Sequence, residues 1–233
     1  MNALVPSVEC GSRPSDRLLR ALAPFGLLAQ HTDRPAPVPP ARTTVDRVLA
    51  LPGGSIALLT GPSGCGKSTL LRAIAETARA DRAHVIDAAV LRREAHPGRP
   101  IIDLFTGPLR DSLRLFAAAG LAEPMLWARA ASELSEGQQL RLSIALAMAK
   151  AHPGVRSVLL LDECCSTLDR VTARGVARTL RRWVSRHRGV LVVCATAHDN
   201  LAAALQPDLV LEPPFAACKA EACATKECDP CTR

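Results

Sequence analysis

Tyrosine is absent from the 233-residue chain, and aromatic residues make up only 3% of it. This scarcity argues against functions that depend on stacked bases, such as an RRM sheet or an aromatic channel for single strands. Lysine is nearly as rare, because only 4 of the 29 basic residues are lysine. Arginine therefore carries the formal net charge of +7, which is a general pointer to acidic or nucleic-acid partners.

Long apolar runs are also missing, although 48% of the residues are hydrophobic. No run approaches the ~20 residues that a membrane-spanning helix requires. Charged residues between Glu9 and Arg17 interrupt any signal-peptide pattern. The nine cysteines do not suggest a secreted disulfide framework, because four lie in the last sixteen residues and two are adjacent. We therefore expect a cytoplasmic protein.

Three parts are expected along the chain. Residues 1–44 are a lead-in with one short leucine-rich helix and a proline-rich linker, and residues 214–233 are a cysteine-rich tail. Between them, from 45 to 213, apolar runs that suit buried strands alternate with helical patterns. The strand-like runs are 55–60, 158–161, 190–194 and 209–211, and the clearest helical patterns are 137–151 and 169–187. This alternation predicts an α/β fold, a mostly parallel sheet with flanking helices, with a small helical insertion at 104–133.

A glycine-rich segment follows the first of these runs and precedes a helical pattern. It matches G-x-x-x-x-G-K-[ST], in which glycines let successive backbone N–H groups point at a phosphate. Lys67 would then reach the β and γ phosphates, and the Ser68 hydroxyl would bind Mg²⁺. The alternative is a chance glycine turn. The predicted nucleotide-binding residues here are Gly61, Ser63, Gly64, Cys65, Gly66, Lys67, Ser68 and Thr69.

Two carboxylates, Asp162 and Glu163, end the apolar run 158–161. Because ligands gather at the carboxyl ends of parallel strands, Asp162 should emerge beside the phosphate loop and hold Mg²⁺. Glu163 could polarise the attacking water as a general base. The alternative is an acidic pair that merely terminates a strand at the surface.

The segment Leu134-Ser135-Glu136-Gly137-Gln138 precedes another helical pattern. Ser135 and Gln138 fit a capping box, which is a sufficient local explanation. The same segment also leaves small residues at a helix N-terminus, which suits contact with an anion.

At this point the sequence resembles the ABC (ATP-binding cassette) ATPases, whose signature LSGGQ appears here as LSEGQ. Ser166-Thr167-Leu168-Asp169 is similar to the family's D-loop, and His198, after the run 190–194, resembles its switch histidine. A lone histidine at a strand end is otherwise an ordinary surface residue. The resemblance extends from about Gly53 to Leu211.

The resemblance implies a P-loop NTPase fold of ABC type and a head-to-tail pair of domains that sandwiches two ATP molecules. Ser135, Gly137 and Gln138 of one subunit would meet the γ-phosphate held by Lys67 of the other. Asp169 would couple the two sites, and His198 would position water with Glu163. A homodimer or a partner ATPase subunit is therefore expected, with Lys67, Glu163 and His198 as the catalytic residues.

The sequence also departs from the family pattern. No glutamine lies between Lys67 and Gln138, so the Q-loop glutamine is missing, and Asp103 is its positional stand-in. No aromatic stands at the family's usual distance before Gly61 to stack on adenine, so the sequence does not indicate selectivity for adenine. Lys67 and Ser135 lie 68 positions apart, fewer than is usual in transporter subunits. These departures argue against a membrane permease as the partner.

The expected function is thus a soluble, Mg-ATP-hydrolysing ATPase that drives a partner. The sequence looks closest to the soluble ABC branch that is sometimes fused to an acetyltransferase-like domain. The alternatives are the ATP-binding subunit of an ABC transporter and a nucleotide-gated binding module that hydrolyses weakly.

Two further features are separate from the nucleotide motifs. The segment 170–188 places its arginines on one side of a helix with no acid among them, which suits either a solvated face or an acidic protein or nucleic-acid partner. The tail spacing C-x4-C-x4-C-x2-C could surround Zn²⁺ or could belong to a reduced, mobile tail. The four tail cysteines are Cys218, Cys223, Cys228 and Cys231.

Overall fold

The structure is a computed structural model that describes residues 7–10, 13–31, 40–95, 97–152, 154–197 and 201–213. The chain separates into two compact units, Met1–Val38 and Pro39–Arg233. In the first unit, β1 (Ser7–Cys10) pairs in parallel with β2 (Leu28–His31). Between them lie α1 (Asp16–Leu22), which is capped by the Ser15 side chain, and the 3-10 helix η1 (Ala23–Phe25). The helix was expected from the leucines, whereas the two strands were not.

A five-stranded sheet forms the centre of the second unit, in the order β4-β5-β6-β3-β7 with every pair parallel. The strands are β3 (Ile56–Thr60), β4 (His84–Asp87), β5 (Ser157–Leu161), β6 (Val190–Thr196) and β7 (Leu209–Leu211). β5 and β6 are buried along their whole length, as is typical of strands covered on both faces. The prediction of a mostly parallel sheet is confirmed.

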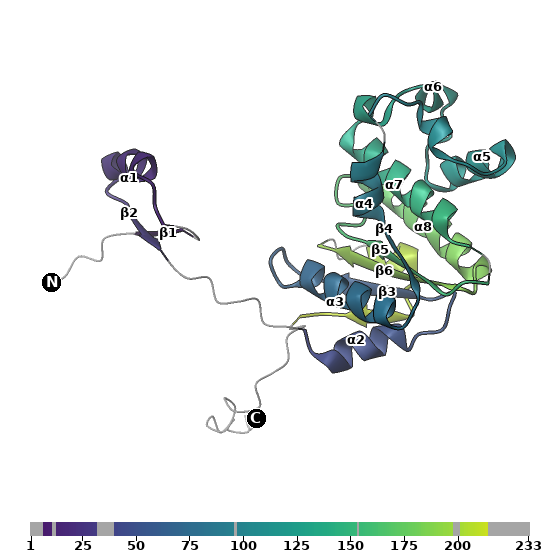
Figure 1. Ribbon diagram of the computed structural model, residues 1–233, viewed down its shortest axis with the longest axis horizontal. Coiled ribbons are helices and arrows are strands. Elements are labelled where there is room, and N and C mark those ends of the chain that lie inside the picture. The colour runs from purple at the N-terminus through teal and green to yellow at the C-terminus, as the bar shows by residue number, and fades with distance from the viewer. Residues whose placement is uncertain are drawn as a thin grey trace, which may run out of the picture. The chain divides into compact units, whose positions relative to one another are not determined.

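Helices cover both faces of this sheet (Figure 1). On one face, α2 (Arg42–Leu49) and α3 (Lys67–Ala80) bury apolar side chains such as Val45 and Ile74 against Leu59. On the other face lie α4 (Ala88–Glu94), α7 (Glu136–Lys150), α8 (Arg170–Arg186) and α9 (Ala202–Leu205). Their core includes Ile144 and Leu180 packed with Leu159.

The expected helical insertion forms a small subdomain beside α7. It contains η2 (Ile101–Leu104), α5 (Leu109–Ala118), α6 (Pro124–Trp127) and η3 (Ala131–Glu133). Its core surrounds Phe116, whose ring meets that of Phe105 edge-on at 4.7 Å between centroids. Leu142 and Leu146 of α7 complete this cluster, so α7 is buried against both the sheet and the subdomain.

The sequence analysis did not identify β4 and α4. β4 is a four-residue edge strand whose first residue is exposed, so it lacks the continuous apolar run that marks the other strands. Among the residues that the structure describes, no helix is both long enough and apolar enough to cross a bilayer. The cysteine-rich tail lies outside the described residues.

Candidate nucleotide site

The phosphate loop connects β3 to α3. Gly61, Gly64 and Gly66 have φ angles of +140°, +82° and +98°, which residues with a Cβ rarely adopt. Gly66 is the left-handed N-cap of α3, and the helix begins at Lys67. The loop therefore brings its backbone to the N-terminus of a 14-residue helix, where N–H groups without intrahelical partners can bind an anion.

The Lys67 side chain folds back over this loop. Its Nζ donates hydrogen bonds to the carbonyl oxygens of Gly61 at 2.7 Å and Pro62 at 2.8 Å, and lies 3.7 Å from the Sγ of Cys65. The ammonium group is thus held against the first two residues of the loop by neutral carbonyl acceptors. A phosphate oxygen can replace these acceptors and form a stronger, charge-assisted hydrogen bond.

The acidic pair lies at the same edge of the sheet. Because β3, β6 and β5 are adjacent and parallel, the phosphate loop and Asp162 both follow carboxyl ends, with β6 between them. At about 4.8 Å per strand spacing, these two strand ends are roughly 10 Å apart. A triphosphate with its metal ion fits such a separation, and the Ser68 hydroxyl and Asp162 carboxylate are the oxygen ligands that Mg²⁺ prefers.

Glu163 occupies a strained turn directly after β5. Its φ angle is +50°, and its backbone N–H donates to the Asp162 Oδ1 at 3.0 Å. Left-handed backbone at a non-glycine residue costs on the order of 1 kcal/mol and is common at functional sites. The Glu163 residue itself is exposed. The next residues, Cys164 and Cys165, are buried. The hydrogen bond between their two thiols, together with burial, raises the pKa of the Cys165 thiol far above its ordinary value.

The signature segment forms a complete capping box. The Gln138 N–H donates to Ser135 Oγ at 3.3 Å, and the Ser135 N–H donates to Gln138 Oε1 at 3.0 Å. Gly137 is closely packed, since a Cβ there would lie 2.9 Å from Leu168 Cδ2, at the end of a flexible side chain, and 3.4 Å from the Thr167 carbonyl oxygen. Both contacts are with the Ser166–Asp169 turn, so the structure brings the signature and D-loop segments together within one chain.

Asp169 serves as the N-cap of α8. Its Oδ1 accepts hydrogen bonds from the N–H groups of Val171 at 2.9 Å and Thr172 at 3.0 Å. Hydrogen bonds from Thr172 are the main reason that the pKa of Asp169 is lowered. The carboxylate is fully exposed, so it remains accessible while it caps the helix.

Three residues near the site were missed by the sequence analysis. The carboxyl end of β4, the strand next to β5, is Asp87, whose side chain caps α4 through the N–H groups of Ala89 and Val90. Arg92 of α4 donates hydrogen bonds from its Nε and Nη2 to Gln139 Oε1 at 3.2 and 3.0 Å. Gln139 in turn donates to the Leu134 carbonyl at 3.1 Å, which ties α4 to the signature segment. No sequence signal pointed to Asp87, because the short strand β4 before it lacks a continuous apolar run.

Two of the sequence-predicted residues lie elsewhere or outside the description. Asp103 is exposed on η2 in the helical subdomain, and its carbonyl oxygen accepts a hydrogen bond from Arg99 at 2.9 Å. Its role as a stand-in for the missing glutamine stays a prediction. His198 lies outside the described residues.

Comparison with known proteins shows the family of the chain. Residues 43–193 match the model of the AAA ATPase domain family. The phosphate import ATP-binding protein PstB of Tropheryma whipplei (strain Twist) is 30% identical over 197 residues, which cover 66% of this chain and 73% of PstB. The chain belongs to the ABC-type P-loop ATPases. It is accordingly an ATP-binding and ATP-hydrolysing protein.

Other ABC relatives and structures are more distant or longer. The aliphatic sulfonates import ATP-binding protein SsuB of Burkholderia pseudomallei (strain K96243) is 33% identical over 177 residues, covering 70% of this ABC chain but only 52% of SsuB. The dimeric structure of MJ0796, a bacterial ABC transporter cassette, superimposes with a TM-score of 0.53 at 22% identity, covering 69% of this chain and 81% of that one. This structural likeness confirms the fold.

Proposed function

We propose that the chain binds Mg-ATP between the phosphate loop and the acidic end of β5 and hydrolyses it there. The observation that supports this most directly is that both segments follow carboxyl ends of one parallel sheet, separated by a single strand. Lys67 would bind the β and γ phosphates, while Ser68 and Asp162 would hold Mg²⁺, which neutralises phosphate charge. Glu163, which is exposed in the turn directly after β5, would accept a proton from the attacking water.

Each site is proposed to be completed by a second subunit. One chain carries a single phosphate loop and a single signature segment, and the signature lies at the N-terminus of α7, where its N–H groups can meet an anion. In a nucleotide-sandwiched homodimer, Ser135, Gly137 and Gln138 of one protomer would face the γ-phosphate on the other. The dimer described for MJ0796 supports this arrangement. Asp169 and His198 are the proposed coupling and γ-phosphate residues.

The biological role that we propose is an ATPase outside membrane transport, which drives a partner protein. Support comes from the missing glutamine between Lys67 and Gln138 and from the short interval of 68 positions between Lys67 and Ser135. The basis for proposing the soluble branch sometimes fused to an acetyltransferase-like domain is its resemblance to three segments: Asp103-Leu104-Phe105, the run 162–170 and the ending Gln206-Pro207-Asp208. The alternative, a transporter subunit, is favoured by relatives such as PstB and SsuB, whose names describe import proteins.

The deciding experiment uses Glu163→Gln, which removes the general base but keeps the shape of the site. Steady-state phosphate release should fall by ~10²–10⁴ while ATP remains bound. Analytical ultracentrifugation should then show an ATP-dependent dimer. A variant that stays monomeric with saturating ATP would contradict the sandwich, and unchanged turnover would contradict the role of Glu163. Wild-type protein with turnover near background would instead support a weakly hydrolysing binding module.

The Glu163→Gln protein, which should keep ATP bound, can also be used to distinguish the two biological roles by its binding partner. Co-purification with a polytopic membrane protein would support the transporter subunit, and a non-membrane partner would support the proposed role. Lys67→Ala, which should not bind ATP, is the matched control.

A further inference from the structure

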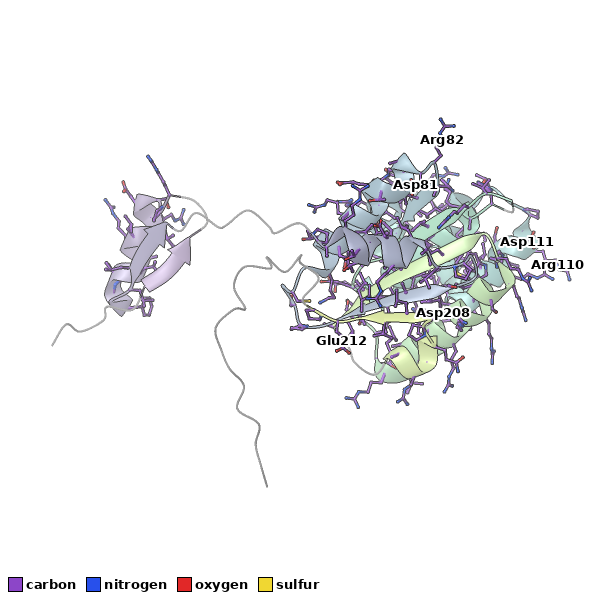
Figure 2. All side chains as sticks on the ribbon, turned by 90° about the horizontal axis from the view of Figure 1, so that it is seen from below. Asp81, Arg82, Arg110, Asp111, Asp208 and Glu212 are labelled. Carbon is purple, nitrogen blue, oxygen red and sulfur yellow. The ribbon has the colours of Figure 1, made fainter. Side chains whose placement is uncertain are left out.

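Helices α5 and α8 carry an unusual surplus of positive charge. Together they contain eight arginines, and their own sequences include one acid, Asp111. Among the described residues, two carboxylates pair with this surface: Asp111 with Arg114 at 3.3 Å, and Asp208 with Arg181 at 2.7 Å. Figure 2 labels both carboxylates. Most of the guanidinium groups are therefore not neutralised by these pairs, and like charges at i, i+4 spacing repel one another.

Part of this surface encloses a groove with a volume of about 830 Å³. It lies between α5, the last turn of α7 and the second half of α8. Its floor is formed by apolar residues, the buried Met148 and the half-buried Leu115 and Ala118, while Ala149 lines the groove from an exposed position. Both α7 and α8 end where β5 and β6 begin, so the groove is at the opposite end of the sheet from the phosphate loop.

The rim of the groove combines charge with an aromatic surface. Arg114, Arg182 and Arg186 line it and are exposed. Between the last two, the Trp183 indole stacks on the His187 imidazole with 4.1 Å between ring centroids, and His187 Nδ1 lies 2.7 Å from the Trp183 carbonyl oxygen. The aromatic pair is thus held in one orientation beside the basic rim.

The walls are also fixed relative to each other. Thr179 Oγ1 of α8 hydrogen-bonds the Ala118 carbonyl oxygen at the end of α5, and it also bonds the Val176 carbonyl at 2.9 Å. A groove that is formed before binding requires little ordering of its own residues when an occupant enters.

We propose that this groove binds an acidic amphipathic helix of a partner protein. The basic rim selects carboxylates, while the apolar floor and the Trp183 face require apolar side chains between them, as in helix-in-groove recognition. A nucleic-acid backbone would satisfy the arginines but would leave the floor exposed to water. The proposal deepens the proposed function, because it names the chemistry of the partner that ATP hydrolysis would drive. The position of the groove leaves the nucleotide edge of the sheet free for the second protomer.

The test begins with selection of peptides from a random 16-residue library on the full chain. We expect enrichment of sequences that alternate acidic and apolar residues at helical spacing. The best labelled peptide is then titrated by fluorescence anisotropy against the wild type and the double variant Arg182→Glu/Arg186→Glu, which should bind it about tenfold more weakly or worse. Ala149→Trp, which fills the groove from an exposed position, should cause a similar loss.

The matched control is Arg174→Glu/Arg178→Glu, which reverses two exposed arginines of the same helix that do not line the groove. It should bind the peptide within about twofold of the wild type. Enrichment of peptides without acidic residues, or equal losses in both double variants, would overturn the proposal. A second result would also overturn it: no acidic peptide binds, but a 20-base-pair DNA or a 20-nucleotide RNA binds tightly to the wild type and not to Arg182→Glu/Arg186→Glu. ATP turnover, measured on every variant, reports separately on the nucleotide site, because none of these residues contacts it.

Discussion

The Lys67 ammonium is bonded to two carbonyl oxygens of its own loop, so its favourable position depends on the loop conformation and not on a neighbouring acid. We expect Lys67→Ala to abolish ATP binding, because no other cation is aimed at the β and γ phosphates by this motif. Isothermal titration calorimetry with ATP would check this. Lys150→Ala, at the far end of α7, is the control and should bind ATP as the wild type does. Retained affinity in Lys67→Ala would remove the phosphate-loop assignment.

Asp169 has a structural and a proposed catalytic role that one pair of variants can separate. Asp169→Asn can still accept the hydrogen bonds from Val171 and Thr172, whereas Asp169→Ala cannot. We expect a lower Tm for the alanine variant alone. If Asp169 also couples two ATP sites, both variants should reduce turnover, as measured by phosphate release. Normal turnover in Asp169→Asn would leave helix capping as its only role.

At the scale of elements, Asp208 connects three of them. Asp208 lies directly before β7. Its Oδ2 accepts a hydrogen bond from the Ile56 N–H of β3 at 2.8 Å, and the same carboxylate pairs with Arg181 of α8. Desolvation at this part-buried position raises the pKa of Asp208, but the bonds from Arg181 and Ile56 outweigh it, so the pKa lies below its ordinary value of 3.8.

This lowered pKa makes the link sensitive to acid. The carboxylate stabilises the fold above pH 3.8, and this contribution is lost as the pH falls through the lower folded pKa. Arg181→Leu should therefore lower the free energy of unfolding at pH 7, and its difference from the wild type should shrink toward pH 2. Urea denaturation across this range measures both effects. Arg178→Leu, one turn earlier on α8, should show no such pH dependence, and similar behaviour of the two variants would contradict the link.

The sequence predicted elements well where burial is uniform. Strands β3, β5, β6 and β7 were recognisable because they are apolar runs, and α7 and α8 were found within one or two residues of their ends. β4 was missed because a short edge strand with an exposed residue carries little hydrophobic pattern. The role of α7 was also not apparent, since only the packed subdomain shows that its second face is buried by Phe116 and its neighbours.

At the scale of the whole molecule, ligand binding should be visible as stability. A ligand that binds only the folded chain at 100 times its Kd adds about 2.7 kcal/mol. Glu163→Gln with saturating Mg-ATP should accordingly have a higher Tm than without nucleotide, and EDTA should remove most of the rise if Ser68 and Asp162 hold the metal. If the sandwich forms, the rise should also increase with protein concentration. A Tm that is insensitive to EDTA would contradict the metal assignment.

The tail cysteines allow a prediction at the same scale. Within the described residues, no three cysteine, histidine or acidic side chains lie together as a metal site. We expect zinc in the reduced protein at Cys218, Cys223, Cys228 and Cys231, because four thiolates at this spacing could surround the ion. Metal analysis of the full chain and of a variant with all four cysteines changed to serine tests this, and equal zinc in both would exclude the tail.

The order and types of residues in the motifs were enough to establish the phosphate loop, the acidic strand end and the signature, because each needs a specific chemistry at a fixed local spacing. Local spacing cannot say which strands are neighbours. Only the packed sheet placed β6 between the phosphate loop and the acidic pair, put Asp87 at the carboxyl end of the strand next to β5, and set Gly137 against Leu168. It also assembled the basic groove from three helices whose contacts are made by residues distant in the chain.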